Sequence, residues 1–390
     1  MDAAGLTALL APEGWALLSA LPPYDEKLAM PLSERMRAEG LDPVLVAAAL
    51  TQSRLRARAH DKLGDFADGM LLTQAGLEQA TRLEVAAHHA RRYRDAGLAH
   101  VADLTCGIGA DSMALAAIGL RVTACEVDEM TAAIATVNLR HFPEATVRHE
   151  DGLATDLDGV DGIYADPARR TSSGARLFDP AAYAPPLDAV LALRSRVPAL
   201  GLKLGPGVPH AALPADAHTQ WVSVDGDVVE AGLWFGPLAP EGPGRSALVL
   251  VGGQGHVVSG STDHPDARPL GAYLYEPDGA VIRAGLVGRT AAEVRGGLVD
   301  PTIAYVTSDE LHPVPTATAY RVLDDLPFGL KRLRSYLRER GVGKLTIKKR
   351  GTAVVPEQLR RQLDLSGDAT GTIVLTRIAG QQRVLVVEPV

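Results

Sequence analysis

The chain is poor in cysteine and has no long apolar run. Its two cysteines, Cys106 and Cys125, are too few for a disulfide framework, which excludes a disulfide-stabilised secreted domain. Apolar stretches such as Val44 to Leu50 are far too short to span a bilayer, so we expect no membrane partner. Histidines and cysteines do not cluster with the spacing of metal ligands, so we expect no metal. The first residues contain no basic leader, and we therefore expect a cytoplasmic protein.

Positive charge is in deficit overall but concentrated in one segment. The net charge is −8, yet eleven lysines and arginines lie between Lys331 and Arg361, against only Glu339 and Glu357. Such asymmetry favours a polyanion-binding module on an acidic body. The alternative is a basic face that is merely solvated or that docks on the acidic body of the same chain. A strand expected in this segment bears the cations predicted to bind the polyanion: Lys344, Lys348, Lys349 and Arg350.

A glycine-containing turn is the most informative motif that is present. A short apolar strand ends at Asp103, and Gly107 and Gly109 follow it before a helix that begins at Asp111. Glycines in such a turn let a ligand approach the backbone, and the helix start offers unpaired N–H groups. The third glycine of a dinucleotide fingerprint is missing, because Ser112 occupies its place. The carboxylates of Asp103 and Asp111 would repel a pyrophosphate, but they suit a ligand with an amino group and a sulfonium, such as S-adenosylmethionine.

Acidic residues also follow the next three expected strands. Glu126 ends the second strand, where a carboxylate can accept hydrogen bonds from both ribose hydroxyls. Asp151 follows the third strand, where it can accept a hydrogen bond from an adenine amino group. Asp166 ends the fourth strand. Ligands of open parallel sheets bind outside the carboxyl ends of the strands, so these residues predict one shared site.

Four stretches together support a family resemblance: Asp103-x-x-x-Gly107-x-Gly109, Glu126, Asp151 and Asp166-Pro167. The series resembles motifs I to IV of the class I S-adenosylmethionine-dependent methyltransferases, over about residues 79–251. The stretches Leu77–Thr81 and Phe328–Val390 narrow the resemblance to bacterial methyltransferases with a C-terminal THUMP-like domain. The resemblance implies a Rossmann-type core that binds S-adenosylmethionine and, further, an RNA substrate.

The turn Gln79-Ala80-Thr81 has two interpretations. The resemblance implies that Gln79 and Thr81 border the methionine end of the cofactor. The run Thr81-Arg82-Leu83-Glu84 also fits a capping box, in which the Thr81 hydroxyl would open a helix that continues to Ala96.

Motif IV departs from the pattern of enzymes that methylate amino groups. Those enzymes usually have Asn/Asp-Pro-Pro-Tyr/Phe, in which the first side chain holds the amine and the ring stacks on the base. This chain keeps Asp166 and Pro167, but Arg169 stands in place of the ring. We expect these three residues to position the nucleophile, with Arg169 stacking on a base, binding a phosphate or pairing with nearby acids. Lys203, at the end of the expected fifth strand, either extends toward solvent or faces the substrate.

The pattern of elements predicts an α/β protein built around a Rossmann-type, seven-stranded methyltransferase sheet. We expect an N-terminal helical domain (1–97), a cofactor-binding domain (98–255) and a C-terminal α+β region (256–390) with the basic module at about 328–390. The module should contain a helix, a strand, a second helix and a hairpin that turns at Ala379-Gly380.

Three further predictions concern the second half of the chain. The last strand of the methyltransferase sheet is expected over residues 247–251, and the family resemblance implies that it runs antiparallel. Glycine, serine, histidine and aspartate dominate residues 252–268, which predicts a linker or an exposed loop. Residues 273–285 resemble a hairpin that turns at Pro277-Asp278-Gly279.

The sequence thus predicts an S-adenosylmethionine-dependent methyltransferase that acts on structured RNA, tRNA or rRNA, which the basic module would dock. Two alternatives stay open: a methyltransferase for a protein or small molecule, and an RNA-interaction protein that binds S-adenosylmethionine with little turnover.

Overall fold

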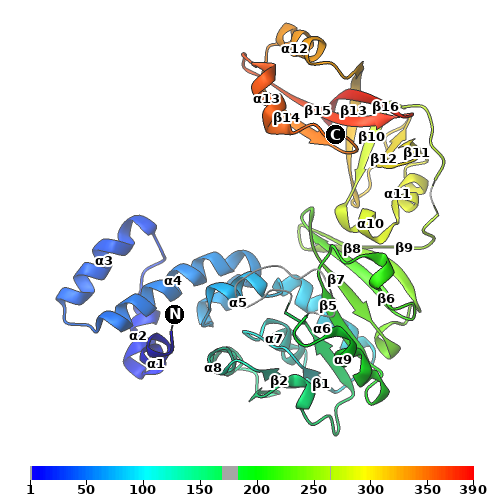
Figure 1. Cartoon of the computed structure of the whole chain (residues 1–390). Coiled ribbons are helices and arrows are strands. Elements are labelled where there is room, and N and C mark those ends of the chain that lie inside the picture. The colour runs from blue at the N-terminus through cyan, green and yellow to red at the C-terminus, as the bar shows by residue number, and fades with distance from the viewer. Residues whose placement is uncertain (1, 169–182, 264) are drawn as a thin grey trace. The chain divides into compact units, whose positions relative to one another are not determined.

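A computed structural model describes residues 2–168, 183–263 and 265–390 (Figure 1). The described chain divides into two compact units. The first comprises Met1–Leu204 with Leu233–Pro240, and the second comprises Gly205–Gly232 with Glu241–Val390. The boundaries expected at residues 97 and 255 remain a proposal about which parts fold on their own.

Helices dominate the chain before the first strand, as predicted. The longest, α4, begins at Pro43, where the Asp42 carboxylate accepts the Val44 N–H at 2.8 Å, and it ends before Gly64. Both ends follow the usual preference for aspartate at the N-cap and glycine after the last turn. The helices of this region are α1 (Ala3–Leu10), α2 (Pro12–Ala20), α3 (Glu26–Ala38), α4 (Pro43–Leu63), α5 (Gln74–Gln79) and α6 (Leu83–Asp95).

The capping box predicted at Thr81 is wrong. Helix α6 begins at Leu83 with Arg82 at its N-cap, and no described side chain caps it. The Thr81 hydroxyl instead donates to the Asp111 carboxylate at 2.6 Å. The Thr81 oxygen, which a helix cap would use as an acceptor, accepts from the Lys203 ammonium at 2.9 Å. Charged partners from distant parts of the chain therefore replace the local cap.

The first sheet contains the predicted Rossmann-type arrangement and extends beyond it. Its strand order is β3-β2-β1-β4-β5-β7-β6-β8-β9, in which the first seven positions, including an unpredicted β7, form a seven-stranded sheet that β8 and β9 extend. Strands β1 to β5 pair in parallel, which brings their carboxyl ends to one edge. These strands are β1 (His100–Asp103), β2 (Arg121–Glu126), β3 (Ala145–His149), β4 (Gly162–Ala165) and β5 (Leu200–Leu204), with helices α7 (Ala110–Ala117), α8 (Glu129–Asn138) and α9 (Leu187–Ala192) between them.

The predictions for the last strands of this sheet need correction. Strand β7 (Asp227–Trp234), which lies between β5 and β6 (His218–Val224), was missed. The strand expected over 247–251 is β8 (Gly244–Val251), and it runs parallel to β6 rather than antiparallel. The expected loop contains β9 (Gln254–Ser259), which pairs antiparallel with β8. The unpredicted strands β7 and β9 have partly polar sequences with glycine. Pairing with neighbouring strands, rather than a local sequence pattern, stabilises them.

A second, seven-stranded sheet has the order β11-β12-β10-β13-β16-β15-β14. The hairpin predicted over 273–285 is wrong, because a helix with Asp278 as its N-cap follows the first strand. The predicted helix, strand, helix and hairpin of the basic module are confirmed. The strands are β10 (Tyr273–Pro277), β11 (Gly297–Asp300), β12 (Ile303–Ser308), β13 (Ala317–Pro327), β14 (Val342–Lys349), β15 (Ala369–Ile378) and β16 (Gln381–Pro389); the helices are α10 (Gly279–Ala284), α11 (Val287–Glu293), α12 (Leu330–Glu339) and α13 (Pro356–Leu363).

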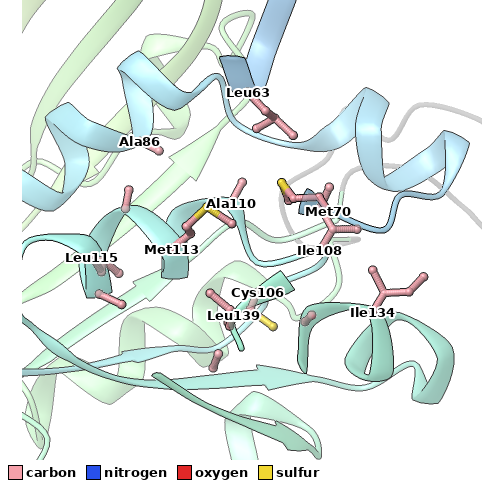
Figure 2. Packing of buried hydrophobic residues seen from close by; sticks show 14 of the residues in the cluster. Leu63, Met70, Ala86, Cys106, Ile108, Ala110, Met113, Leu115, Ile134 and Leu139 are labelled. Atoms are coloured by element: carbon pink, nitrogen blue, oxygen red, sulfur yellow. The ribbon is translucent and has the colours of Figure 1, made fainter. Parts of the chain in front are cut away.

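The N-terminal helical region shares a buried core with the glycine turn. Figure 2 shows Met70, from the segment after α4, beside Ile108 of the turn, with Met113 of α7 nearby. All three belong to one buried cluster. The Asn138 amide adds a polar link, since it accepts from Leu71 N at 2.7 Å and donates to Ile108 O at 2.9 Å. The turn is therefore held from behind by apolar packing and by a buried amide.

Candidate functional site

The turn after β1 presents its backbone to a cavity. Gly107 and Gly109 have φ values of +54° and +91°, a region that favours glycine. A Cβ on Gly107 would meet open space, whereas a Cβ on Gly109 would lie 3.3 Å from the Leu139 side chain. Gly109 is the N-cap of α7, and no described side chain caps this helix. The first N–H groups of α7 can therefore bind a ligand.

Two acidic residues at neighbouring strand ends face the same space. The Glu126 carboxylate, at the end of β2, accepts the Gly107 N–H at 3.1 Å and the Asp128 N–H at 2.9 Å. These contacts orient the side chain before any ligand binds. The Asp151 carboxylate, which follows β3, accepts the Leu153 N–H at 3.0 Å. Gly152 must be glycine, because a Cβ there would lie 2.2 Å from the Leu104 carbonyl oxygen.

These groups border a cavity of about 540 Å³, a volume suited to a nucleotide-sized ligand. Its walls come from α5, the turn after β1 and the ends of β2 and β4. The residues present fit S-adenosylmethionine, because glycine backbone and carboxylates meet around one space. The predicted site residues that line the cavity are Gln79, Thr81, Gly107, Asp111, Glu126, Asp151 and Asp166.

Asp103 and Gly109 are absent from the described residues that line the cavity. Asp103 is only 1% exposed, and its carboxylate accepts the Ser112 hydroxyl at 2.6 Å and the Thr105 N–H at 3.2 Å. Burial raises the pKa of Asp103 to about 7. Asp103 thus stabilises the turn through these hydrogen bonds. A direct contact between Asp103 and the cofactor, as the sequence predicts, would require the side chain to leave these partners.

A buried carboxylate connects α7 to two elements from the N-terminal region. Asp111 accepts the Thr81 hydroxyl at 2.6 Å, and its other oxygen lies 2.9 Å from His89 Nδ1. Burial alone would raise the pKa of Asp111, but the hydrogen bond and charge of His89, with Lys203 and Thr81, lower it. His89 is not among the predicted site residues, although helical spacing places it on the buried face of α6 with Ala86, Ala90 and Tyr93.

Motif IV lies beside this group. The Asp166 N–H donates to the Thr105 hydroxyl at 2.7 Å, and the Asp166 carboxylate receives a hydrogen bond of 2.5 Å from Lys203 Nζ. Pro167 is buried. Arg169, the third predicted catalytic residue, lies outside the described part of the chain. Lys203 is 6% exposed, so the interpretation that it extends into solvent is wrong.

An aromatic residue missed by the sequence analysis lies next to motif IV. Ala168 pairs with Ala184 through two backbone hydrogen bonds of 2.8 and 3.1 Å. This bridge places Tyr183 in the cavity wall that also contains Asp166 and Ala168. No sequence signal marks Tyr183, because it lies in an irregular, proline-rich segment and reaches motif IV only through a long-range pairing.

The four cations predicted to contact a polyanion behave as two pairs. Lys344 and Lys349 are exposed. Lys348 Nζ lies 2.5 Å from the Glu276 carboxylate, and the Arg350 guanidinium lies 3.7 Å from the same group. Burial by itself would lower the pKa of Lys348, but the hydrogen bond to Glu276 raises it. Lys348 and Arg350 thus have an intramolecular partner that the sequence analysis did not foresee.

Two family models match parts of the chain. One, described as THUMP domain-like, matches residues 317–389, which begin at β13 and include the basic module. The other, a domain of unknown function, matches residues 2–59 in the N-terminal helices.

Two named relatives match most of the chain. Two Mycobacterium tuberculosis proteins, from strains CDC 1551 and H37Rv, are each 37% identical over 334 residues, which is 83% of this chain and 90% of theirs. Each is named an uncharacterized S-adenosylmethionine-dependent methyltransferase. The crystal structure of a Porphyromonas gingivalis W83 protein, assigned as a methyltransferase, matches with a TM-score of 0.71 at 20% identity. It covers 94% of this chain and 99% of its own, which supports the fold.

The described residues contain neither a membrane-spanning helix nor a group of side chains that could bind a metal ion. No helix there is long and apolar enough to cross a membrane. No group of three or more histidine, cysteine, aspartate or glutamate side chains in the same ranges could hold a metal ion.

Replacing Asp103 by asparagine should stabilise the fold at alkaline pH. The raised pKa of Asp103 means that the folded state favours the protonated acid. The stability that this proton contributes is present below about pH 4 and is lost as the pH rises toward 7. Asparagine does not ionise, so melting temperatures of Asp103→Asn and the unmodified protein should diverge between pH 5 and pH 8. An identical difference at every pH would contradict this assignment.

Replacing Glu126 by alanine should weaken binding of S-adenosylhomocysteine by about 1.5–3 kcal/mol, the range for hydrogen bonds to a charged group. Isothermal titration calorimetry measures the change directly. Glu129→Ala is the matched control, because Glu129 is exposed and lies on the adjacent helix outside the described cavity lining. Equal dissociation constants for the two variants would show that Glu126 does not contact the cofactor.

Proposed function

The chain belongs to the family of S-adenosylmethionine-dependent methyltransferases, and from this premise we propose that it methylates a base nitrogen of structured RNA, tRNA or rRNA. The C-terminal basic module docks the RNA. The observation that carries the RNA proposal is a set of exposed cations on α12, β14 and α13, within the segment that matches a THUMP domain-like model. They are Lys331, Arg332, Arg338, Lys344, Lys349, Arg360 and Arg361, with Arg340 directly after α12.

The exposed cations suit a phosphate backbone. Helices α12 and α13 bury leucines, such as Leu333 and Leu359, against the sheet and leave most of their arginines and lysines in solvent. Such a surface binds the phosphates of a nucleic acid by releasing condensed counterions. A small-molecule or protein methyltransferase does not require this surface.

The cavity residues divide the cofactor and substrate roles. In this proposal Gly107 approaches the cofactor through its backbone, Glu126 accepts from its ribose, and Asp151 accepts from its adenine. When bound, S-adenosylmethionine supplies a methyl group on a sulfonium for an in-line displacement. The protein's own contribution is alignment and exclusion of water.

Asp166 is the group proposed to hold the nucleophile. Its carboxylate accepts an N–H hydrogen bond from the base and thereby turns the nitrogen lone pair toward the methyl group. The nitrogen gains the methyl group and releases one proton, which the carboxylate passes to water. The Tyr183 ring, in the adjacent wall, offers an apolar face for a planar base and takes the role of the ring that motif IV lacks.

Replacing Asp166 by asparagine should reduce methyl transfer at least about 100-fold, the scale of a missing proton-transfer group. Asparagine keeps an oxygen for Lys203, so the buried ammonium retains a partner and the fold survives. The assay measures transfer of labelled methyl groups to tRNA and rRNA isolated from cells that lack this protein. Cofactor affinity should stay within about three-fold.

Asp95→Asn provides the matched control for Asp166→Asn, because Asp95 is exposed at the end of α6, away from the described cavity lining. Normal turnover by Asp166→Asn would show that motif IV is not the active site. Tight RNA binding without any methyl transfer by the unmodified protein would favour an RNA-interaction protein instead.

Neutralising four exposed cations of the basic module should weaken RNA binding and flatten its salt dependence. The variant replaces Lys331, Arg332, Lys344 and Arg361 by glutamine and spares Lys348, whose removal would leave Glu276 without its ammonium partner. For each phosphate that the variant no longer binds, the logarithmic salt slope should fall by about 0.7–0.9. Binding is measured by fluorescence anisotropy with labelled tRNA across a salt series.

The matched control replaces four exposed arginines of the first unit by glutamine: Arg35, Arg37, Arg91 and Arg94. It changes the net charge equally, so it should lower non-specific attraction without changing the slope as strongly. Equal effects in both quadruple variants would mean that overall charge, rather than the module, governs RNA binding.

A further inference from the structure

We propose that Lys203 is a positioning residue, which holds the Asp166 carboxylate in its ionised form and fixes it against the turn that follows α5. Lys203 then acts on the reaction through Asp166 rather than by touching the substrate. The inference rests on the proposed role of Asp166 in holding the nucleophile.

The position of the ammonium carries this inference. Lys203 lies in β5, all of whose residues are buried. Its Nζ lies 2.5 Å from the Asp166 carboxylate, 2.9 Å from the Thr81 hydroxyl and 3.4 Å from the Gln79 carbonyl oxygen. Each of the three N–H groups of an ammonium can therefore donate to a protein oxygen.

Lys203 lies behind the cavity wall rather than in it. Its partners Gln79, Thr81 and Asp166 all belong to the described cavity lining, whereas Lys203 does not. One buried cation thus joins three lining residues that come from two distant parts of the chain. This arrangement suits a residue that positions the cavity lining, and it does not suit a residue that binds the substrate.

The contact between Lys203 and Asp166 also affects the ionisation of the Asp166 carboxylate. A carboxylate in a partly buried site is disfavoured in its ionised form, and a neighbouring ammonium reverses this preference. Among the described residues, other charged or titratable groups around the pair are Asp103 on β1, Asp111 on α7, His89 on α6 and Lys62 on α4. The negative charges of Asp103 and Asp111 oppose ionisation of Asp166, whereas the Lys203 ammonium at 2.5 Å favours it.

Lys62, on α4, offers a comparison, because its ammonium also contacts the end of α5 and the turn that follows it. Its Nζ donates to the carbonyl oxygens of Leu77 and Glu78 at 2.8 Å and of Ala80 at 3.3 Å. Burial, followed by the charge of Lys203, lowers the pKa of Lys62. Both lysines therefore anchor the end of α5, but the contacts of Lys62 are to carbonyl oxygens and those of Lys203 include the Asp166 carboxylate.

The experiment compares Lys203→Met with Lys62→Met in the full-length protein. Carbon-13 NMR of labelled aspartate carboxyls, assigned with Asp166→Asn, follows the ionisation of Asp166. We expect Lys203→Met to raise the pKa of Asp166 by about 1–3 units, the usual effect of removing an adjacent opposite charge. Lys62→Met should leave it nearly unchanged. Lys203→Gln serves as a second uncharged variant if the methionine variant does not fold.

Methyl transfer to RNA from cells lacking the protein gives the second readout. In Lys203→Met the acidic limb of the pH–rate profile should move upward with the Asp166 pKa, so activity recovers at alkaline pH. The affinity for S-adenosylhomocysteine should stay within about three-fold.

The outcomes separate the two proposals. An unshifted Asp166 titration in both uncharged Lys203 variants would overturn the positioning role, as would a higher KM for RNA with an unchanged pH profile, which would make Lys203 a substrate ligand. If the unmodified protein methylates no RNA, the proposed function fails, while the NMR titration still decides what Lys203 does.

Discussion

A buried chain of polar contacts, from Asp166 through Lys203 and Thr81 to Asp111, is the interaction on which the site depends. It links the ends of β4 and β5 to the start of α7 and to the turn after α5. Buried charges are costly unless they are paired, so the contacts favour the arrangement in which these elements meet. The contacts that satisfy these charges therefore also fix the position of motif IV relative to the glycine turn after β1.

The part of the site that local sequence encodes could be predicted well. A strand, a glycine turn and a helix follow one another within a few residues, and each acidic residue stands directly after its strand. Parallel pairing then brings the strand ends together, because parallel strands share the direction of their carboxyl ends. Glu126, Asp151 and Asp166 consequently line one cavity, although they are far apart in the chain.

The remainder depends on pairings between distant segments, which a single sequence does not reveal. Thr81 fits a helix cap by its local pattern, but its hydroxyl donates to Asp111 and its oxygen accepts from the Lys203 ammonium instead. Lys348 belongs to a basic run, yet Glu276 on another strand neutralises part of its charge. Tyr183 reaches motif IV only because the strand-like bridge at Ala184 forms. Strands such as β7 were missed for the same reason, since their neighbours decide their stability.

The central claim is that this methyltransferase modifies a base of structured RNA. Mass spectrometry of nucleosides from purified tRNA and rRNA, compared between cells with and without the protein, tests it most directly. We expect one N-methylated nucleoside to disappear when the protein is absent and to return with the unmodified protein but not with Asp166→Asn. Identical methylated nucleosides in both sets of RNA would contradict the account.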